Sequence, residues 1–228
     1  MLKHKLFTLF IPILPALNWW VGKYSADSTG PVLTTEMCER DSISQLSAML
    51  PIIASEYEAA RGYATDIEGA LFFPVGLTEG GLWKKYVLKW YDAPSDEAKR
   101  LFPATVGLIQ RYSDVHLAMF SILGPGETIK PHCGPWRGSV RVHLCVSTPM
   151  SLLDEKMSHC VLNVAGQGYI YAESAVFAFD DTYEHSVVNR SNEERVVLFL
   201  DVERKMKTAM AQRFVSFFNS TIAKLTTR

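Results

Sequence analysis

The spacing of apolar and polar positions changes part-way along the chain and predicts two kinds of element. From about residue 115 to residue 204, short runs rich in β-branched and aromatic residues alternate with turn residues at intervals of roughly 8 to 12 positions, which is typical of an antiparallel sandwich or barrel. In chain order these runs are VHLAMFSIL, SVRVHLCVS, HCVLNV, GYIYA, AVFAFD, HSVVN and RVVLFLDV. The pattern therefore predicts a mainly β core for this part of the chain.

Helical spacing dominates the segment before this core. Apolar residues recur three or four positions apart from Ile43 to Tyr63, which predicts a helix capped by Asp41 or Ser42. Pro51 falls inside this helix and marks either a kink or the true start, because proline is tolerated only in the first turn.

Three more elements follow from the same kind of pattern. Aromatic and apolar positions alternate over residues 79–91 and predict a strand. Pro94 and Ser95 open a helix that extends to about Arg111 and is interrupted at Pro103. Residues 205–227 have helical periodicity with no Pro or Gly, so we expect a C-terminal helix that covers the barrel.

The N-terminal segment is compositionally unusual. Basic residues precede a mostly apolar stretch, residues 6–21, which contains Pro12 and Pro15. This stretch is shorter than the roughly 20 residues that span a bilayer, and prolines interrupt helices. Three interpretations stay open: a segment packed on the domain, an interfacial or single-pass membrane anchor formed by residues 1–23, and a signal sequence. The expected localisation is accordingly cytoplasmic or membrane-associated.

Length, charge and cysteine content limit the class of protein. The 228 residues suit a single domain over residues 42–228, preceded by an apolar segment and connector over residues 1–41. The net charge of −1 and the lack of a basic, aromatic stripe argue against a nucleic-acid partner. The four cysteines form no C-x-x-C pair, which favours free thiols in a reducing compartment over two disulfides.

The strand predicted over residues 139–147 has two chemically different faces. Its odd positions are Ser139, Arg141, His143 and Cys145, and its even positions are Val140, Val142, Leu144 and Val146. Because successive side chains of a strand point to opposite sides, the apolar face must pack beneath another element. The Arg/His face then lines either solvent or a polar cavity inside the barrel.

Two histidines and a second arginine stand near strand ends in the same region. His132 lies in the sequence PHCGP, which predicts a rigid turn, and His185 begins the run HSVVN. Arg195 opens the run RVVLFLDV, where an arginine is costly unless it meets an anion. Two imidazoles suit iron(II), and two arginines suit a dicarboxylate held by bidentate contacts. Each residue also has an ordinary alternative, as a turn or buried histidine or as half of a structural ion pair.

An ordered series of motifs runs through residues 45 to 204. It consists of Gly81-Leu82-Trp83-Lys84, Pro103-Ala104-Thr105, Ser121, Pro125-Gly126, Ile129, Pro131-His132, Gly134-Pro135, Arg141, His143-Leu144, Phe179 to His185 (FDDTYEH), Asn189, Arg195 and Asp201. This series resembles the aspartyl/asparaginyl β-hydroxylase family.

The resemblance implies a mainly β double-stranded β-helix, of the jelly-roll or cupin-like kind, flanked by α-helices. It also implies an iron(II)- and 2-oxoglutarate-dependent dioxygenase that uses O₂ to hydroxylate an unactivated C–H bond. His132, His185 and Arg141 would be the catalytic residues. The resemblance also implies a role for each site residue. His132 and His185 would bind iron(II), and Ser121 and Arg195 would hold the distal carboxylate of 2-oxoglutarate. Arg141 and His143 would lie near the C1 end of 2-oxoglutarate and the substrate, and Trp83 would line the pocket.

Two positions depart from what such enzymes usually carry. Many oxygenases of this superfamily have a carboxylate ligand two residues after the first histidine, and here that residue is Gly134. Members that hydroxylate aspartyl residues carry an arginine where this chain has Ser139. In this chain Arg137, from the preceding turn, is the candidate to replace that arginine. We expect Asp180 and Asp181 to act as strand-end groups that orient ligands, and a direct contact of either with the metal is the minority alternative.

The substrate stays open at this stage. A small molecule, an amino acid and a lipid-like compound are all compatible with the motifs, the last because relatives hydroxylate lipid A acyl chains near membranes. The alternatives to a family-like hydroxylase are therefore a membrane-associated hydroxylase of a lipid or lipopolysaccharide component, and a non-catalytic cupin-like binding module. A membrane-tethered interaction protein rests on residues 1–23 alone.

Overall fold

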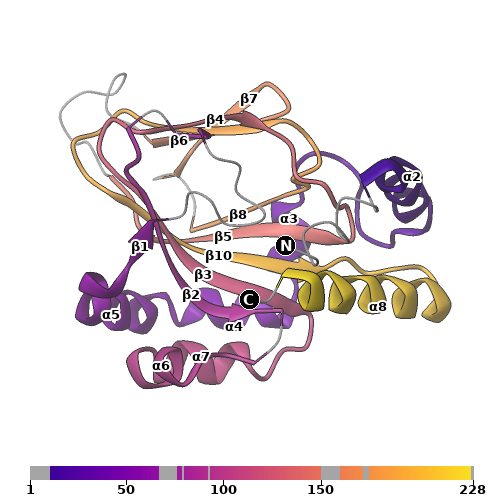
Figure 1. Ribbon diagram of the computed structural model, residues 1–228, viewed down its shortest axis with the longest axis horizontal. Helices are drawn as coiled ribbons and strands as arrows, with labels where there is room; N and C mark the ends of the chain where they lie inside the picture. Colours follow the sequence, from indigo (N-terminus) through magenta and orange to yellow (C-terminus); the bar gives the residue numbers. More distant parts are fainter. Residues whose placement is uncertain are drawn as a thin grey trace.

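Eight consecutive strands, β3 to β10, wind into two facing antiparallel sheets (Figure 1). The computed structural model describes residues 11–66, 76–78, 80–91, 93–149, 160–171 and 175–226. One sheet has the strand order β3-β10-β5-β8, extended by β2 and β1, and the other has the order β4-β9-β6-β7. This topology is the predicted double-stranded β-helix.

The strands are β1 (Thr65–Asp66), β2 (Trp83–Trp90), β3 (Val115–Leu123), β4 (Thr128–His132), β5 (Ser139–Ser147), β6 (Cys160–Val164), β7 (Gln167–Ile170), β8 (Val176–Phe179), β9 (His185–Asn189) and β10 (Arg195–Glu203). The helices are η1 (Ile11–Ile13), α2 (Leu14–Tyr24), α3 (Thr34–Cys38), α4 (Asp41–Ala48), α5 (Leu50–Ala60), η2 (Arg61–Tyr63), α6 (Asp96–Leu101), α7 (Pro103–Ile109) and α8 (Ala209–Thr226).

Strand β5 separates two hydrophobic cores. Its even-numbered residues Val140, Val142 and Leu144 are completely buried against the helices α4 to α7, which cover the outer face of the six-stranded sheet (Figure 1). Burial of each such side chain stabilises the fold by about 1.5–3 kcal/mol. Arg141 and His143 point to the opposite side, into the space between the sheets. The two-faced strand is confirmed, and its polar face lines the barrel interior rather than solvent.

Proline positions divide the predicted helices. The helix expected from Ile43 to Tyr63 is in fact α4 and α5, because Pro51 occupies the first turn of α5 and marks a true start. Neither expected cap residue is an N-cap, since α4 already begins at Asp41. The break predicted at Pro103 is confirmed, and Ser95 caps α6 by accepting a hydrogen bond from the Ala98 N–H.

Strand β4 differs from the predicted turn around His132. The segment 128–132 is a strand that ends at His132, and its pairing with β9 is irregular between Ile129 and His132. Pro131 is tolerated because β4 is the edge strand of its sheet, where one backbone N–H has no ladder partner to lose. The short length and the proline hid the strand from the alternation pattern.

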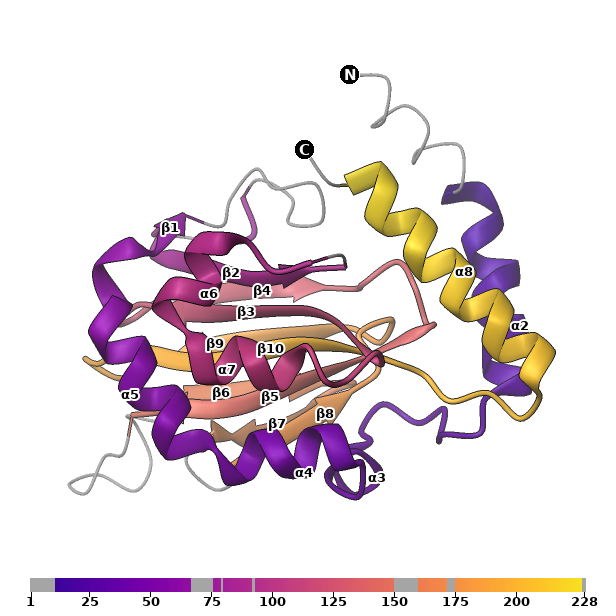
Figure 2. The ribbon, with the colours of Figure 1, turned by 90° about the horizontal axis from the view of Figure 1, so that it is seen from below.

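Helices α2 and α8 pack against each other at one end of the molecule (Figure 2). Pro15 lies in the first turn of α2 and therefore does not interrupt it. The expected C-terminal helix is present as α8, but it pairs with α2 instead of covering the barrel, and their shared core includes Val21, Trp136 and Val215.

The N-terminal apolar segment is described only in part, and the four cysteines are all described. Residues 1–10 of the apolar segment lie outside the described residues. Within the part of the chain that the structure describes, no helix has the length and apolar character needed to cross a bilayer. Cys38, Cys133, Cys145 and Cys160 are free thiols, as expected.

Candidate active site

His132 and His185 face each other across two adjacent strands. They are register partners in the antiparallel pair β4–β9, and their ring centroids are 4.2 Å apart. Both side chains line a cavity inside the barrel. The register of β4 against β9, within one sheet, thus holds these two imidazoles next to one another.

Backbone hydrogen bonds orient both rings. The Nδ1 atom of His132 lies 2.8 Å from the carbonyl oxygen of Lys130, and that of His185 lies 3.0 Å from the carbonyl oxygen of Tyr183. A carbonyl only accepts, so each Nδ1 carries the proton and each Nε2 presents a lone pair. Metal-binding histidines are commonly oriented in this way.

Both histidines are held in the neutral form. Burial, and then the neighbouring His132, lower the pKa of His185 to about 3, and burial also lowers the pKa of His132. Neutral imidazole is the form that binds a metal ion. The pair is therefore ready to act as ligands without first losing a proton.

This depressed pKa predicts a pH-dependent stability. The unfolded chain protonates His185 near pH 6.5 and the folded chain near pH 3, so the metal-free protein should lose stability as the pH falls through this window. The loss attributable to His185 is at most about 1.4 kcal/mol per pH unit, and none is expected above pH 6.5. Urea unfolding at several pH values should show a shallower acid loss in His185→Gln. Parallel curves for the two proteins would contradict the assignment.

Asp181 fills the space where a third ligand is usually attached. A Cβ atom at Gly134 would lie 2.2 Å from Asp181 Oδ2, and the Gly134 N–H donates to the Asp181 carbonyl oxygen at 2.6 Å. Among the described residues, no group of three His, Cys, Asp or Glu side chains is arranged to hold a metal ion. Within the described structure the histidine pair therefore has no carboxylate beside it that could complete a three-ligand site.

Arg195 is a buried cation with most of its hydrogen-bonding capacity unused. Its side chain is 1% exposed, and within the described structure its Nε and Nη1 atoms have no hydrogen-bond partner. The guanidinium lies 5.1 Å from the ring centre of Tyr171. Burial of an unpaired charge is expensive. The arrangement therefore suits an anion that enters the cavity.

Two predicted pocket residues lie close to this arginine in the sheet. Ser121 and Trp83 also line the cavity, and the indole N–H of Trp83 donates to the Ser121 hydroxyl oxygen at 3.0 Å. Leu123 pairs with Trp83 on one side and with Arg195 on the other. The three strands β2, β3 and β10 thus bring the predicted anion-binding residues to one end of the cavity.

His143 contributes a second unsatisfied polar atom. Its Nδ1 atom lies 2.9 Å from the hydroxyl of Tyr171, whereas its buried Nε2 has no partner among the described residues. Burial, and then the charges of Arg195 and Arg141, hold the pKa of His143 well below its usual value. The ring is therefore a neutral group with one nitrogen available inside the cavity.

Arg141, in contrast, is already paired. Its Nε donates to Asp201 and its Nη2 to Asp181, both at 2.7 Å, and the guanidinium lies 4.0 Å from the ring centre of Phe199. Burial raises the pKa of Asp181 to about 6, a shift that Arg141 only partly opposes. Arg141 lines the cavity as predicted, but two carboxylates share its charge.

Asp180 and Arg137 belong to a separate structural ion pair. Asp180 is fully buried, accepts a hydrogen bond from Arg204 Nη2 at 2.9 Å and forms an ion pair with Arg137 Nε, also at 2.9 Å. Its other oxygen accepts from the backbone N–H and the hydroxyl of Thr182. The strand-end role expected for Asp180 therefore agrees with the geometry. Arg137 is committed to this cluster rather than directed into the cavity.

Sequence reasoning missed two residues that shape the cavity. Tyr171 supports both His143 and Arg195, yet it lies in the run GYIYA with no polar neighbour to single it out. Asp201 was noted within a motif but given no role. Its position six residues after Arg195 carried a signal, because equal parity on one strand places both side chains on the inner face.

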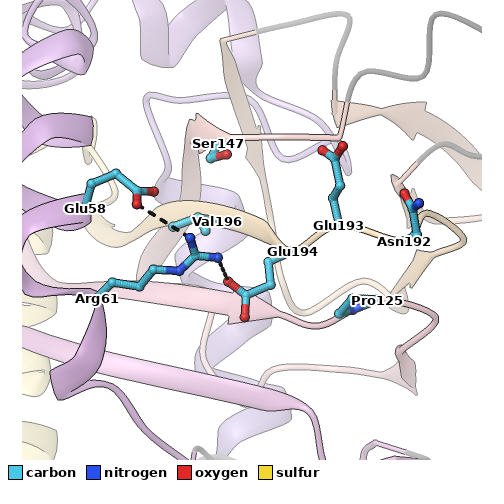
Figure 3. Close-up of a pocket in the computed structure, with 8 residues that line it drawn as sticks. All are labelled: Glu58, Arg61, Pro125, Ser147, Asn192, Glu193, Glu194 and Val196. Atoms are coloured by element: carbon cyan, nitrogen blue, oxygen red, sulfur yellow. Dashed lines mark hydrogen bonds and ion pairs between the residues drawn. The ribbon is translucent and has the colours of Figure 1, made fainter.

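A second depression lies on the surface near the start of β10 (Figure 3). Arg61 occupies it and pairs with Glu58 and Glu194. These charges are exposed and mutually satisfied, so they make only a small contribution to stability. The interior cavity, with its oriented histidines and unpaired arginine, is the candidate active site.

The fold and the cavity together define a double-stranded β-helix protein with an interior two-histidine site. A model of the aspartyl/asparaginyl β-hydroxylase family matches residues 47–205, so the chain belongs to this family. The family's curated members include hydroxylases, which classes the chain with enzymes of that kind.

Individual relatives share part of the chain. It is 32% identical to an ornithine lipid ester-linked acyl 2-hydroxylase of Rhizobium tropici, over 59% of this chain and 46% of the relative. It is 27% identical to the mouse aspartyl/asparaginyl β-hydroxylase, over 63% of this chain and 19% of the relative. The chain thus spans less than half the length of these relatives. A prolyl-4-hydroxylase from Pseudomonas putida has a similar structure, with a TM-score of 0.45 at 12% identity over 70% of this chain and 88% of the other.

Proposed function

We propose that this protein is an iron(II)- and 2-oxoglutarate-dependent dioxygenase that hydroxylates an unactivated C–H bond. The observation that carries the proposal is that one cavity holds two neutral, oriented imidazoles and a buried guanidinium whose Nε and Nη1 have no partner among the described residues. The family's hydroxylases support the same conclusion. The proposal therefore rests on a site that has acceptors for a cation and donors for an anion.

The residues present fit iron(II). His132 and His185 would bind it through Nε2, which both hydrogen-bonding patterns leave available. Imidazole is a common ligand of iron(II). Because Gly134 supplies no carboxylate, the remaining positions on the metal would be filled by solvent and the co-substrate.

The cavity also fits a dicarboxylate. Arg195 would hold the distal carboxylate of 2-oxoglutarate with the Ser121 hydroxyl beside it, and His143 would face the C1 end through Nε2. A bidentate guanidinium–carboxylate contact satisfies both partners at once. Trp83 would fix the serine hydroxyl and close one wall.

The protein's own contribution is positioning and exclusion of water. When iron, 2-oxoglutarate and O₂ are bound, they supply the oxidant: 2-oxoglutarate becomes succinate and CO₂, and one oxygen atom enters the substrate C–H bond. The Asp181–Arg141–Asp201 ion-pair network fixes the cavity wall next to Phe199. Both sheets bury the site, which favours a controlled reaction over loss of a reactive species to solvent.

The charges of the cavity favour an apolar substrate over an aspartyl side chain. Arg141 and Arg195 are the cations among its lining residues, and the first is shared by two carboxylates. Ser139 adds no positive charge, and Arg137 is paired with Asp180. The rest of the lining is largely apolar and includes Ile129, Phe179, Val187 and Phe199. We therefore propose an acyl chain as the substrate, the group hydroxylated by the Rhizobium relative.

A non-catalytic binding module remains the second class of function. The unsatisfied Nε and Nη1 of Arg195 argue for an anion that binds in this cavity, since an apolar residue there would otherwise be more stable. A module that only bound this anion would not need the oriented, neutral histidine pair in the same cavity, so the pair favours the enzyme.

Anaerobic titration with iron(II) and 2-oxoglutarate tests the proposal. Wild-type protein should develop the visible metal-to-ligand charge-transfer band, and His132→Ala and His185→Ala should lose it. His116→Ala is the control, because His116 pairs with Glu203 and does not line the cavity. No band in the wild type would refute the oxygenase proposal. Succinate release should then be greater with an acylated lipid than with an aspartyl peptide.

A further inference from the structure

The positive charge of this nearly neutral chain is concentrated at its two ends. Residues 1–24 and 205–228 together contain eight of the 23 Lys and Arg residues and none of the 24 Asp and Glu residues. The stretch between them therefore contains 15 basic and 24 acidic residues. Two strongly basic segments flank an acidic catalytic domain.

The fold brings these two segments together. Helices α2 and α8 lie side by side at one end of the molecule (Figure 2). The backbone N–H of Lys207 donates to the Tyr24 carbonyl oxygen at 2.8 Å, and the rings of Trp20 and Phe214 are 5.0 Å apart. Among the described residues, Lys23 lies at the end of α2, and Lys205, Lys207 and Arg213 lie in or just before α8. These charges, more than 180 positions apart in the sequence, thus belong to one structural unit, which we call the α2–α8 pair.

The α2–α8 pair also exposes an unusual amount of apolar surface. Five of the eight large hydrophobic side chains exposed in the described structure belong to it or to the turn η1 that leads into it. They are Ile13 (47% exposed), Trp19 (66%), Met210 (79%), Phe214 (37%) and Phe217 (70%). Clustered exposed apolar residues mark an interaction surface, whereas single ones are ordinary.

The helix α8 is apolar on two sides. Ala211, Val215 and Phe218 face the core shared with α2, at the spacing of one helical face. Met210, Phe214 and Phe217 recur at positions i, i+4 and i+7 on a second face. Phe214 is partly exposed and also contacts Trp20 of α2, whereas Met210 and Phe217 are mostly exposed to solvent. Burial of Met210 and Phe217 is therefore not required for packing within the described structure.

We propose that the α2–α8 pair is a docking surface for an anionic lipid bilayer. Aromatic and aliphatic side chains at the lipid boundary, with lysines reaching the headgroups, are the composition that interfacial helices use. Lys23 lies 5.4 Å from the Trp19 ring centre and thereby joins both kinds of group. Each basic residue near an anionic leaflet contributes attraction, and no acidic residue in either segment opposes it.

The docking surface contacts the segment that follows His132 in the chain. The Asn18 side chain of α2 donates to the Pro135 carbonyl oxygen and accepts from the Arg137 N–H, at 3.0 and 2.9 Å. Trp136 donates to the Asn219 side chain of α8 at 2.8 Å. Both helices thus hold the segment 133–138, which begins immediately after His132. A bilayer bound by the pair would lie next to the segment that directly follows His132, a residue of the cavity lining.

This inference agrees with the proposed acyl substrate but rests on separate observations. The charge distribution and the exposed side chains of the α2–α8 pair do not depend on iron, 2-oxoglutarate or turnover. Its test therefore uses the full chain without either cofactor, so that a failure here would leave the proposed oxygenase chemistry untouched.

Vesicle sedimentation tests the docking surface. The protein should bind vesicles of phosphatidylcholine mixed with phosphatidylglycerol, bind phosphatidylcholine alone much more weakly, and dissociate as salt is raised. The double variant Trp19→Ser/Phe217→Ser should bind at least about tenfold more weakly at an unchanged melting temperature, because both side chains are exposed. Ile52→Ser is the matched control, since Ile52 is 49% exposed on α5 at another part of the surface.

Two outcomes would overturn the proposal. One is no binding of the wild type to the anionic vesicles, or equal binding by the wild type and the double variant. The other is concentration-dependent dimerisation of the wild type that the double variant abolishes, which would identify the α2–α8 pair as an interface between copies of this chain. The charge reversal Lys207→Glu should weaken vesicle binding, whereas Ile52→Ser should bind vesicles as the wild type does.

Discussion

Replacing Arg195 with methionine should abolish 2-oxoglutarate binding and at the same time raise the thermal stability of the cofactor-free protein. The affinity should fall by two to three orders of magnitude or more, because removing one partner of a buried charge pair costs roughly 2–5 kcal/mol. Stability should rise because methionine fills a similar space without an unpaired buried charge. A gain of about 1–2 kcal/mol would raise the melting temperature by roughly 2–8 °C for a chain of this size.

Calorimetric titration with 2-oxoglutarate and a thermal melt of the cofactor-free protein measure the two effects. Arg190→Met is the matched control, since Arg190 is exposed after β9 and should change neither quantity. Unchanged affinity in Arg195→Met would exclude the predicted carboxylate contact. A lower melting temperature would show that the guanidinium is already satisfied in the cofactor-free protein.

Introducing aspartate at Gly134 should damage the protein instead of restoring a three-ligand metal site. A Cβ at this position lies 2.2 Å from an oxygen of Asp181, and Asp181 is held in place by Arg141. Overpacking and displacement of the ion pair should together cost roughly 3 kcal/mol or more. Iron affinity, measured anaerobically, should fall or stay unchanged.

The double variant Gly134→Asp/Asp181→Gly provides the decisive comparison. Removing the Asp181 side chain opens the space that the new carboxylate needs, so the double variant should be more stable than Gly134→Asp alone. Gly107→Ala in α7 is the control, because a Cβ there meets no atom within 4 Å and alanine is the better helix former. If Gly134→Asp alone keeps the wild-type stability and binds iron more tightly, Asp181 does not exclude a ligand at this position.

The strand pattern predicted the barrel because its information is local. Seven strands of the β-helix were visible as runs such as HSVVN, and each run corresponds to a strand that pairs along its length. The eighth strand, β4, escaped because it is a short edge strand containing Pro131, whose interruption of the ladder resembles a turn. Likewise, the sequence pattern left open whether Pro51 marks a kink or a helix start, and the structure shows that a separate helix, α5, begins at Leu50.

The sequence could identify a site residue where burying that residue type without a partner costs free energy. An arginine at the head of an apolar run needs a partner anion, and this singled out Arg195. The state of Arg141 could not be read in the same way, because its partners Asp181 and Asp201 come from segments 40 and 60 positions away. Tyr171 is a similar case, since only the folded barrel places its hydroxyl against His143.

The partition of β5 between two cores has a consequence for how this protein can change. Substitutions at the even positions 140, 142 and 144 alter a core shared with the helices and leave the cavity lining intact. Substitutions at Arg141 and His143 alter the cavity lining and leave that core intact. An insertion or deletion of one residue exchanges the two faces, which would bury the side chains of Arg141 and His143 beneath the helices. Along this strand the cavity lining and the helix-packed core can therefore change separately by substitution, whereas a change in length disrupts both in a single step.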